Sequence, residues 1–308
     1  MTSDIPGRPE LGAVVVGVDA STPAREAALW AAAEADHRGG PLHIVHASDS
    51  DRRVFHSSAD TIQAVREAGR KLLAETAAAV RESRPDLVVT TELSRQGPVA
   101  GLHAAAGERG TIVVGNRGLG GFGSLMLGSV GLGVAARTEV PVIVVRGAAD
   151  RPGTGVVTAA VHGASDLDWL RIAAAEAQAR KASLRLLSVY NVLAHVGGVT
   201  TMLDSLGDIA DEKVHEVAAV AERLSQLYPD LPLVHHVETG TSVPGMLVEA
   251  SVHTDLMVMG SKRRVLGAGP ALGRVAHAML HHGNCPVEII PPGYADEAAG
   301  TSEVADAS

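Results

Sequence analysis

The feature that most constrains the fold is an internal repeat, because a chain that carries one pattern twice is built from two similar units. Near the start, AVVVGVDAS precedes an Ala-rich helical stretch and the strand-like run PLHIVHAS, and after residue 155 the same order returns as VVTAAVHGAS, a helical stretch and SLRLLSVYNV. The late runs at 111–115 and 255–260 both end in glycine, and the Pro-led runs VPVIVV (140–145) and CPVEII (285–290) follow them at the same distance. The sequence therefore predicts a tandem duplication.

Within each half, short apolar runs of strand length alternate with helical stretches. Residues 62–82 carry apolar side chains at helical spacing with charges on the other face, and residues 208–228 repeat the pattern. Strands alternating with helices form a parallel sheet through right-handed crossovers. The predicted fold class is α/β, with two tandem, open, parallel five-stranded sheets of the Rossmann type that carry helices on both faces.

The 308 residues suit two domains of about 150 residues each. Polar and small residues at both ends predict disorder, and the Gly- and Pro-containing stretch between the halves predicts a linker. The predicted organisation is a disordered N-terminus at 1–11, a first domain at 12–147, a linker at 148–155, a second domain at 156–293 and a disordered tail at 294–308.

Composition and charge exclude several classes of function. A net charge of −9 gives the chain no gain from counterion release, so we expect no nucleic-acid partner. A single cysteine rules out an internal disulfide and four-cysteine metal sites, and the 14 histidines are too scattered to predict a metal centre. The apolar runs are far shorter than a membrane span and no secretory signal is recognisable, so we expect a cytoplasmic protein without a membrane partner.

A glycine-rich stretch, GNRGLGGFGSLMLGS (115–129), carries the clearest functional signal. Parallel open sheets bind ligands beyond the carboxyl ends of their strands, which is where this stretch lies. Its glycines allow close backbone approach, and Gly128-Ser129 opens a helix whose first amides and hydroxyl can donate to phosphates. The alternative is a flexible turn with an ordinary serine cap.

The same stretch contains GLGGFG (118–123), which matches the dinucleotide pattern GxGxxG letter by letter. That pattern belongs directly after the first strand, with an acidic residue at the end of the next strand. Here it follows a late strand, and the nearest acid, Glu139, precedes its strand. The pattern therefore does not indicate a dehydrogenase.

A longer spacing is more specific. Gly115, two residues, Gly118, nine residues and Gly128-Ser129 is the spacing found in ATP-binding members of the universal stress protein family, and VVGVDAS, LHIVHAS, GSV and PVIVVR also resemble that family. The resemblance covers nearly the whole chain, with the second half as the weaker copy, and is closest in kind to tandem-domain members. It implies a sheet of the adenine nucleotide alpha hydrolase-like type.

The resemblance also implies roles in the first half. Asp19 would lie beside the ribose and phosphates, directly or through Mg²⁺, and the backbone at Ala47 would meet the adenine edge. The complete predicted nucleotide-binding set is Asp19, Ala47, Val114, Gly115, Arg117, Gly118, Gly128, Ser129 and Val130. Two alternatives come from the residues themselves: Asp19 as the N-cap of the following helix, and Arg117 as a solvated loop charge.

The second half departs from this pattern. Arg263 replaces the middle glycine, Arg274 replaces the serine, and His162 stands about where Asp19 stands in the first half. The second half is then either a degenerate copy kept for packing or a site for another anion at residues 262–264. We expect one nucleotide per chain, bound by the first half.

The sequence thus predicts a universal stress protein that binds ATP in its first domain, with or without Mg²⁺, and acts as a nucleotide-dependent sensor or regulator in a stress response. The alternatives are a slow ATPase or nucleotidyl-transferring enzyme using the same pocket, and a scaffold that binds no nucleotide. No catalytic residue is assigned. The resemblance further implies that the last strands, 140–145 and 285–290, pair the two domains of one chain, and that two chains form a homodimer.

Overall fold

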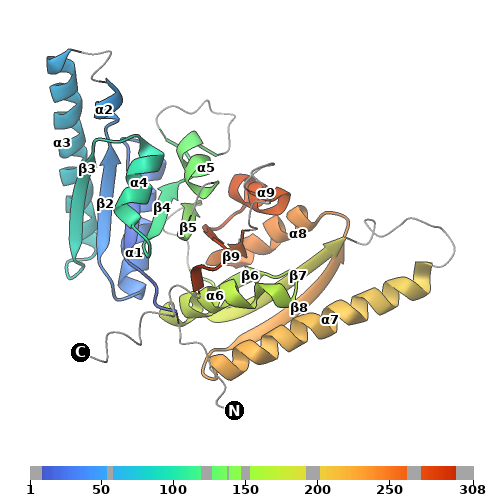
Figure 1. Cartoon of the computed structure of the whole chain (residues 1–308). Coiled ribbons are helices and arrows are strands. Elements are labelled where there is room, and N and C mark those ends of the chain that lie inside the picture. The colour runs from blue at the N-terminus through green and yellow to red at the C-terminus, as the bar shows by residue number, and fades with distance from the viewer. Residues whose placement is uncertain are drawn as a thin grey trace. The chain divides into compact units, whose positions relative to one another are not determined.

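The computed structural model describes residues 9–53, 58–118, 127–136, 139–146, 153–191, 202–261 and 272–295. These residues form two compact α/β units, domain 1 in the first half of the chain and domain 2 in the second (Figure 1). Each unit is built around a parallel sheet, which confirms the predicted fold class.

Domain 1 contains β1 (Val14–Gly17), β2 (Leu42–Ala47), β3 (Val89–Ser94), β4 (Thr111–Gly115) and β5 (Val142–Val145). Their order in the sheet is β3-β2-β1-β4-β5, and every pair is parallel. The central strands are almost wholly Val and Ile and are buried, as expected of strands covered on both faces. The strand order reverses between β1 and β4, so a ligand crevice is expected beyond the carboxyl ends of these two strands.

The helices of domain 1 are α1 (Thr22–His37), α2 (Ser50–Arg53), α3 (Ala59–Ser83), α4 (Pro98–Ala106) and α5 (Ser129–Ala135). α1 and α3 pack against each other on one face of the sheet, and α4 and α5 pack against each other on the opposite face (Figure 1). The buried face of α1 consists mainly of alanines, which lets the helix lie close to β1 and β4.

Domain 2 repeats the arrangement with β6 (Val156–Ala160), β7 (Ser183–Asn191), β8 (Leu233–Gly240), β9 (Leu256–Gly260) and β10 (Val287–Ile290), in the order β10-β9-β6-β7-β8. Its helices are α6 (Leu167–Ala179), α7 (Met202–Leu227), α8 (Val243–Ala250) and α9 (Arg274–His282). A short 3-10 turn, Ala164–Asp166, precedes α6, and another, Ser251–His253, follows α8.

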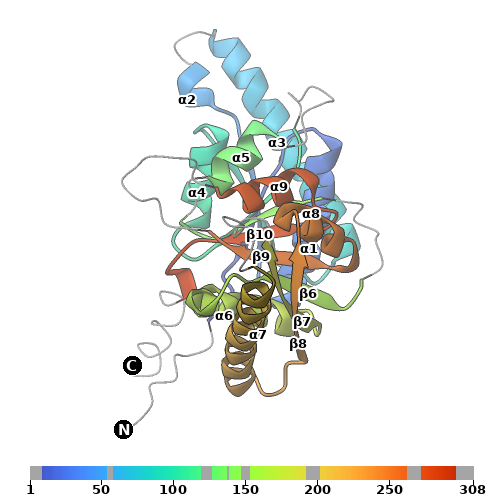
Figure 2. The ribbon, with the colours of Figure 1, turned by 90° about the vertical axis from the view of Figure 1, so that its right-hand side faces the viewer.

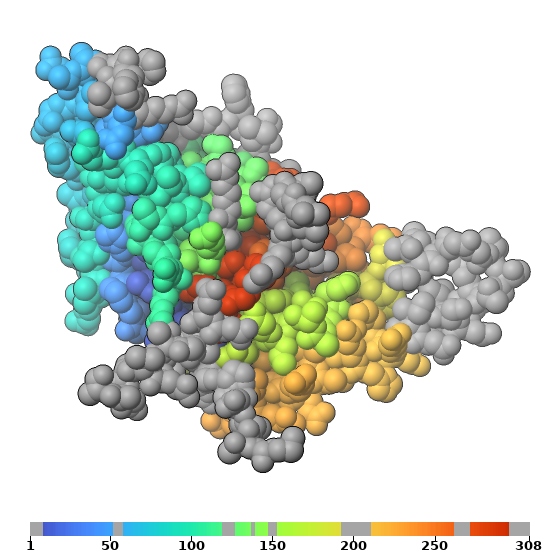
Figure 3. Space-filling model, viewed as in Figure 1, coloured from blue at the N-terminus to red at the C-terminus, as the bar shows by residue number. Residues whose placement is uncertain are grey.

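The long helix α7 packs along β8 in both ribbon views (Figures 1 and 2). Its buried residues, among them Val217, Val220 and Leu224, recur at helical spacing, while its other side is exposed on the face seen in Figure 3. No helix within the described ranges is both long and apolar enough to traverse a lipid bilayer.

Sheet register aligns the two domains residue by residue. Val14 pairs with Thr111 and Val157 pairs with Leu256, and Thr111 and Leu256 each lie four residues before the glycine that closes their strand. Val14 and Val157 are therefore equivalent. Because Asp19 and His162 each lie five residues further on, His162 occupies the position of Asp19 without any shift.

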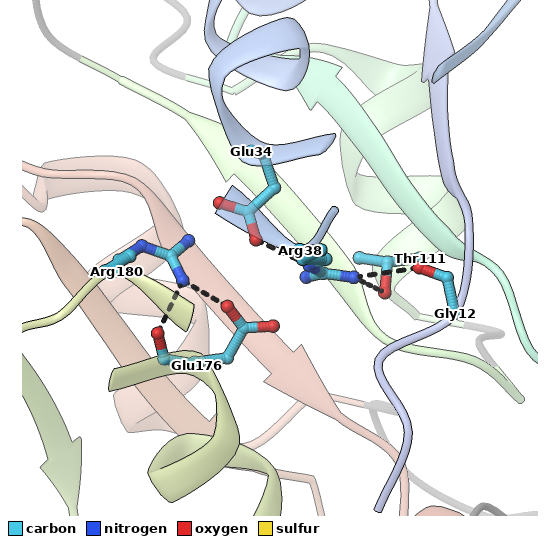
Figure 4. Close-up of polar contacts among 6 residues, drawn as sticks. All are labelled: Gly12, Glu34, Arg38, Thr111, Glu176 and Arg180. Atoms are coloured by element: carbon cyan, nitrogen blue, oxygen red, sulfur yellow. Dashed lines mark hydrogen bonds and ion pairs between the residues drawn. The ribbon is translucent and has the colours of Figure 1, made fainter. Parts of the chain in front are cut away.

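Each domain also contains a buried ion pair at the end of its first helix (Figure 4). In domain 1, Arg38 Nε donates to Glu34 Oε1 at 2.6 Å, and Arg38 Nη1 donates to Thr111 Oγ1 at 2.7 Å. In domain 2, Arg180 Nη1 pairs with the Glu176 carboxylate and donates to the Glu176 carbonyl at 3.1 Å. All four side chains are less than 10% exposed, so this pair belongs to the scaffold that the two domains share.

Most of the predicted linker and both predicted disordered ends lie outside the described residues. Of the predicted tail at 294–308, Tyr294 and Ala295 are described, and both side chains are buried. Of the predicted N-terminus, residues 9–11 are described, and Pro9 is buried.

Candidate functional site

A cavity of about 510 Å³ opens at the carboxyl ends of β1, β2 and β4, which is the crevice expected from the strand order. Its volume lies within the range of small-molecule sites. The lining includes all nine residues predicted from the sequence: Asp19, Ala47, Val114, Gly115, Arg117, Gly118, Gly128, Ser129 and Val130. Residues from separate segments of domain 1 thus meet around one space.

Asp19 follows β1 and is held by the turn that leads into α1. Its Oδ1 accepts hydrogen bonds from the Ser21 amide at 2.9 Å and from the Ser21 hydroxyl. The Ser21 hydroxyl oxygen in turn accepts from the Ala24 amide at 3.3 Å, so Ser21 is the N-cap of α1. The interpretation of Asp19 as the helix cap is therefore wrong, and its carboxylate is instead oriented at the edge of the cavity.

The first two glycines of the motif are closely surrounded by other parts of the chain. A Cβ added at Gly118 would lie 2.5 Å from Asp19 Oδ2, so the carboxylate occupies the space that a side chain would need. A Cβ added at Gly115 would lie 2.7 Å from the Pro23 carbonyl oxygen, at the start of α1. The sequence explained these glycines by ligand approach, whereas the structure explains them first by close packing around Asp19 and α1.

The third element of the spacing, Gly128-Ser129, begins α5. The Gly128 amide donates to the Asn116 carbonyl at 2.8 Å, which joins the two ends of the glycine-rich stretch. The Leu132 amide is bonded to the Gly128 carbonyl at 3.1 Å, so the amides of residues 129–131 precede the first helical hydrogen bond of α5. All three residues line the cavity. Residues 119–126, including Gly120, Gly121 and Gly123, lie outside the described part of the chain.

The remaining wall is largely apolar and was not predicted in full. Leu102 and Pro98 of α4 and Leu127 before α5 line the cavity, as do Val18 and Val45 at the ends of β1 and β2. Pro98 at the first turn of α4 was a recognisable helix start, but the sequence could not place that helix over the carboxyl ends of β1 and β2. The cavity therefore combines an apolar wall with one edge of polar and glycine residues.

Positive charge gathers at this polar edge. Arg117 lines the cavity and is exposed. Arg146 directly follows β5, and its pKa is lowered by burial and further by the positive charge of Arg117. An anion bound beside Arg117 would therefore offset part of the repulsion between these two positive charges. The sequence contained Arg146 in the run PVIVVR but assigned it no role.

Domain 2 differs at the equivalent loop. The amides of His162 and Gly163 donate to Asp166 Oδ2 at 2.5 and 3.0 Å, and the Ala164 amide donates to Glu216 Oε1 at 3.0 Å. Carboxylates of the chain itself thus accept three successive backbone donors of this loop.

Glu216 lies on α7 and is paired with Lys213, whose Nζ donates to Glu216 Oε2 at 2.5 Å and to the His162 carbonyl at 3.0 Å. The hydrogen bonds from Lys213 and from the Ala164 amide lower the pKa of Glu216. Arg274, the counterpart of Ser129, is exposed at the start of α9, and residues 262–264 lie outside the described part of the chain. The sequence did not predict the contribution of α7.

Comparison with known proteins identifies relatives along the whole chain. The family model for the universal stress protein family matches residues 11–146 and 156–291. Universal stress protein Rv2005c of Mycobacterium tuberculosis is 29% identical over 289 residues, covering 90% of this chain and 96% of that protein. Universal stress protein Rv2624c of the same organism is 27% identical over 299 residues, covering 92% and 98%. These matches confirm the tandem resemblance.

Among solved structures, the crystal structure of a universal stress protein from Archaeoglobus fulgidus DSM 4304 has a TM-score of 0.60 at 16% identity, covering 91% of this chain and 96% of that one. At this level of identity the likeness concerns the fold, and it agrees with two parallel sheets flanked by helices.

Proposed function

The chain belongs to the universal stress protein family, and from this premise we propose that domain 1 binds ATP and that the protein is a nucleotide-dependent regulator in a stress response. The observation that carries the proposal is the convergence of nine sequence-predicted residues on one cavity of about 510 Å³.

The chemistry of the cavity suits the parts of ATP. The apolar wall formed by Val18, Val45 and Leu102 offers a surface for the base. The amides of residues 129–131 and the guanidinium group of Arg117 offer donors and positive charge for phosphates. The Asp19 carboxylate is an oxygen ligand of the kind that Mg²⁺ prefers, so a bound Mg²⁺ would neutralise charge between Asp19 and the phosphates.

A regulatory role fits these residues better than catalysis. Among the described residues that line the cavity, Asp19 is the one carboxylate and His46 the one imidazole, and His46 Nδ1 is already bonded to the Val18 carbonyl at 2.8 Å. General base catalysis needs a group within reach of the attacking water. Asp19 is the candidate for the alternative function, a slow ATPase or a nucleotidyl-transferring enzyme.

Calorimetry with ATP and Mg²⁺ tests the proposal. We expect one ATP per chain, an affinity loss of at least about tenfold in Asp19→Ala because a charged partner is removed, and no change in the matched domain 2 variant His162→Ala. Extraction and identification of the nucleotide in freshly purified protein provides a second test. Absence of ATP binding by the wild type, or two equivalent ATP molecules per chain, contradicts the proposal.

A turnover assay on the same samples separates regulator from enzyme. Hydrolysis at the background rate supports a regulator. Substantial turnover that Asp19→Ala abolishes supports the ATPase instead.

Assembly and location complete the proposal. We propose a cytoplasmic protein whose domains pair through residues 140–145 and 285–290, and whose chains form a homodimer, as the family resemblance implies. The chain mass is 31.6 kDa, so light scattering distinguishes a monomer from a dimer of twice that mass.

A further inference from the structure

His46, at the carboxyl end of β2, lines the cavity and also holds the turn that presents Asp19. Its Nδ1 lies 2.8 Å from the carbonyl oxygen of Val18, the residue directly before Asp19. A carbonyl oxygen only accepts, so Nδ1 carries the hydrogen and the tautomer of the neutral ring is fixed. The Val18 amide donates to the Val45 carbonyl at 2.9 Å, so both polar groups of Val18 are bound to β2.

The position of this ring depends on a glycine in the middle of α3. A Cβ added at Gly69 would lie 2.8 Å from His46 Cδ2 and 2.7 Å from Leu93 Cδ1. Glycine inside a helix costs about 0.5–1 kcal/mol relative to alanine. Gly69 is buried in a helix of 25 residues, and the space taken by the His46 ring together with the Leu93 side chain explains its presence there.

Domain 2 has different residues in the same corner, which is the place where the end of its second strand meets the long helix that follows and the turn after the first strand. Leu42 and Leu184 pair with the equivalent residues Val14 and Val157, so the residue four positions on in β7, Ser188, is the counterpart of His46. Leu42 also pairs with the first residue of β3, and Leu184 with the first residue of β8.

Counting back 20 residues from these two strand starts, Val89 and Leu233, gives Gly69 on α3 and Lys213 on α7. In domain 2, Ser188 therefore stands in place of His46, and Lys213 stands in place of Gly69.

The exchange changes what fills the corner. In domain 2 the donor to the strand-end loop is Lys213, whose Nζ donates to the His162 carbonyl at 3.0 Å. Lys213 is accompanied by Glu216, whose carboxylate accepts from the Ala164 amide and occupies the space that a Cβ at Gly163 would need. In domain 1 the donor is a ring from the sheet, and α3 contributes no side chain at Gly69.

We propose that His46 and Gly69 form a positioning pair for the nucleotide site of domain 1. The His46 ring fixes the turn that presents Asp19, and Gly69 leaves room for that ring in the corner that Lys213 and Glu216 occupy in domain 2. That the site binds a nucleotide rests on the proposed function, whereas the hydrogen bond between the His46 ring and the Val18 carbonyl is independent of it.

Three variants test the role of the ring. His46→Leu keeps bulk but removes the donor, His46→Asn keeps an amide N–H near the position of Nδ1, and Ser188→Ala is the matched change in domain 2. Hydrogen exchange of residues 18–24 without ligand and ATP affinity by calorimetry are measured for each. We expect His46→Leu to accelerate exchange and to weaken ATP binding, each about five- to tenfold, the factor expected for one net hydrogen bond. His46→Asn should restore both to within about twofold, and Ser188→Ala should change neither.

A double-mutant cycle tests the partnership with Gly69. Gly69→Ala should accelerate exchange of residues 18–24 in the wild-type background by displacing the ring. When His46→Ser has already removed the ring, the effect should be clearly smaller, because the close approach of the new Cβ to Leu93 Cδ1 is what remains. Equal effects of Gly69→Ala in both backgrounds would show that the glycine acts independently of the ring and would overturn the pairing.

The two readouts separate this inference from the proposed function. If the wild type binds ATP but His46→Leu leaves exchange and affinity unchanged, or if His46→Asn fails to rescue them, the positioning role is wrong. If no variant binds ATP but exchange follows the expected pattern, the proposed function fails while the positioning of the Asp19 turn stands.

Discussion

The two domains share a scaffold but differ in how they treat the loop after the first strand. In domain 1, the Ser21 amide is bonded by the neighbouring Asp19 carboxylate, and a cavity lies beside it. In domain 2, three successive amides are bonded by Asp166 from the same turn and by Glu216 from α7. The equivalent amides of Ser21 and Ala164 are thus both bonded by a carboxylate of the chain, which comes from the neighbouring Asp19 in domain 1 and from the distant helix α7 in domain 2.

This difference shows that two copies of a sheet can keep the same packing while a few side chains change the hydrogen bonding at the carboxyl ends of its strands. Backbone donors at the carboxyl edge of a parallel sheet have to be satisfied by something. Domain 2 satisfies them with carboxylates supplied internally, so an external anion would have to displace a charged group that already carries hydrogen bonds. The two domains therefore differ in the loop after the first strand as well as in the glycine–serine motif.

The largest effect on stability is expected from breaking the buried ion pair that each domain contains. Glu34→Ala and Glu176→Ala each remove the carboxylate from a buried guanidinium group, and leaving a buried charge without its partner costs about 3–5 kcal/mol. Urea unfolding monitored for each variant should show losses of similar size. Lys71→Ala, which breaks the exposed pair with Glu75 at the same i,i+4 spacing, is the control, with an expected loss below about 0.5 kcal/mol. Losses no larger than the control would show that the pairs are not part of the scaffold.

The next largest effect concerns the glycines of domain 1. Gly118→Ala places a Cβ 2.5 Å from Asp19 Oδ2, so the carboxylate must move, and we expect ATP affinity to fall about tenfold. Gly128→Ala is the matched control for exchange measured without ATP, because its Cβ would lie 3.6 Å from the nearest protein atom, Arg117 Cα. Hydrogen exchange of residues 18–24 without ATP should change in the first variant and not in the second. The reverse pattern would show that Asp19 does not depend on Gly118.

The fold could be predicted because it follows from local patterns, whereas the nine residues that line the candidate site were implied by the resemblance to a known family. Apolar runs and helical spacing give the parallel sheet, and the carboxyl ends of parallel strands necessarily share an edge. Asp19 after β1, Ala47 at the end of β2 and Gly115 at the end of β4 therefore had to converge.

What could not be predicted depends on contacts between elements distant in sequence. Glu216 belongs to a helix whose charges resemble an ordinary solvated face, and only the packing of α7 brings its carboxylate to the Ala164 amide. For the same reason the helical pattern gave no explanation for Gly69, whose Cβ would collide with the His46 ring. Periodicity identifies the buried face of a helix but not which strand end a given side chain reaches.

The smallest expected effect is a dependence on pH confined to domain 2. The pKa of Glu216 is lowered by its hydrogen bonds from Lys213 and the Ala164 amide. A carboxyl group with a lowered pKa in the folded state stabilises that state above its unfolded pKa and loses this contribution as pH falls through the folded value. Glu216→Gln should therefore be less stable than the wild type at pH 7, by less than about 1 kcal/mol because the pair is partly exposed.

The stability difference between Glu216→Gln and the wild type should shrink as the pH falls below the usual glutamate range, because the wild-type carboxylate is then protonated as well. Thermal unfolding at several pH values measures it, with Glu222→Gln as the control for an exposed glutamate on the same helix. A difference that stays constant from neutral to acidic pH would mean that the negative charge of Glu216 does not hold the loop. In that case the conformation of this loop would have to be assigned to Asp166, which accepts from the other two amides of the loop.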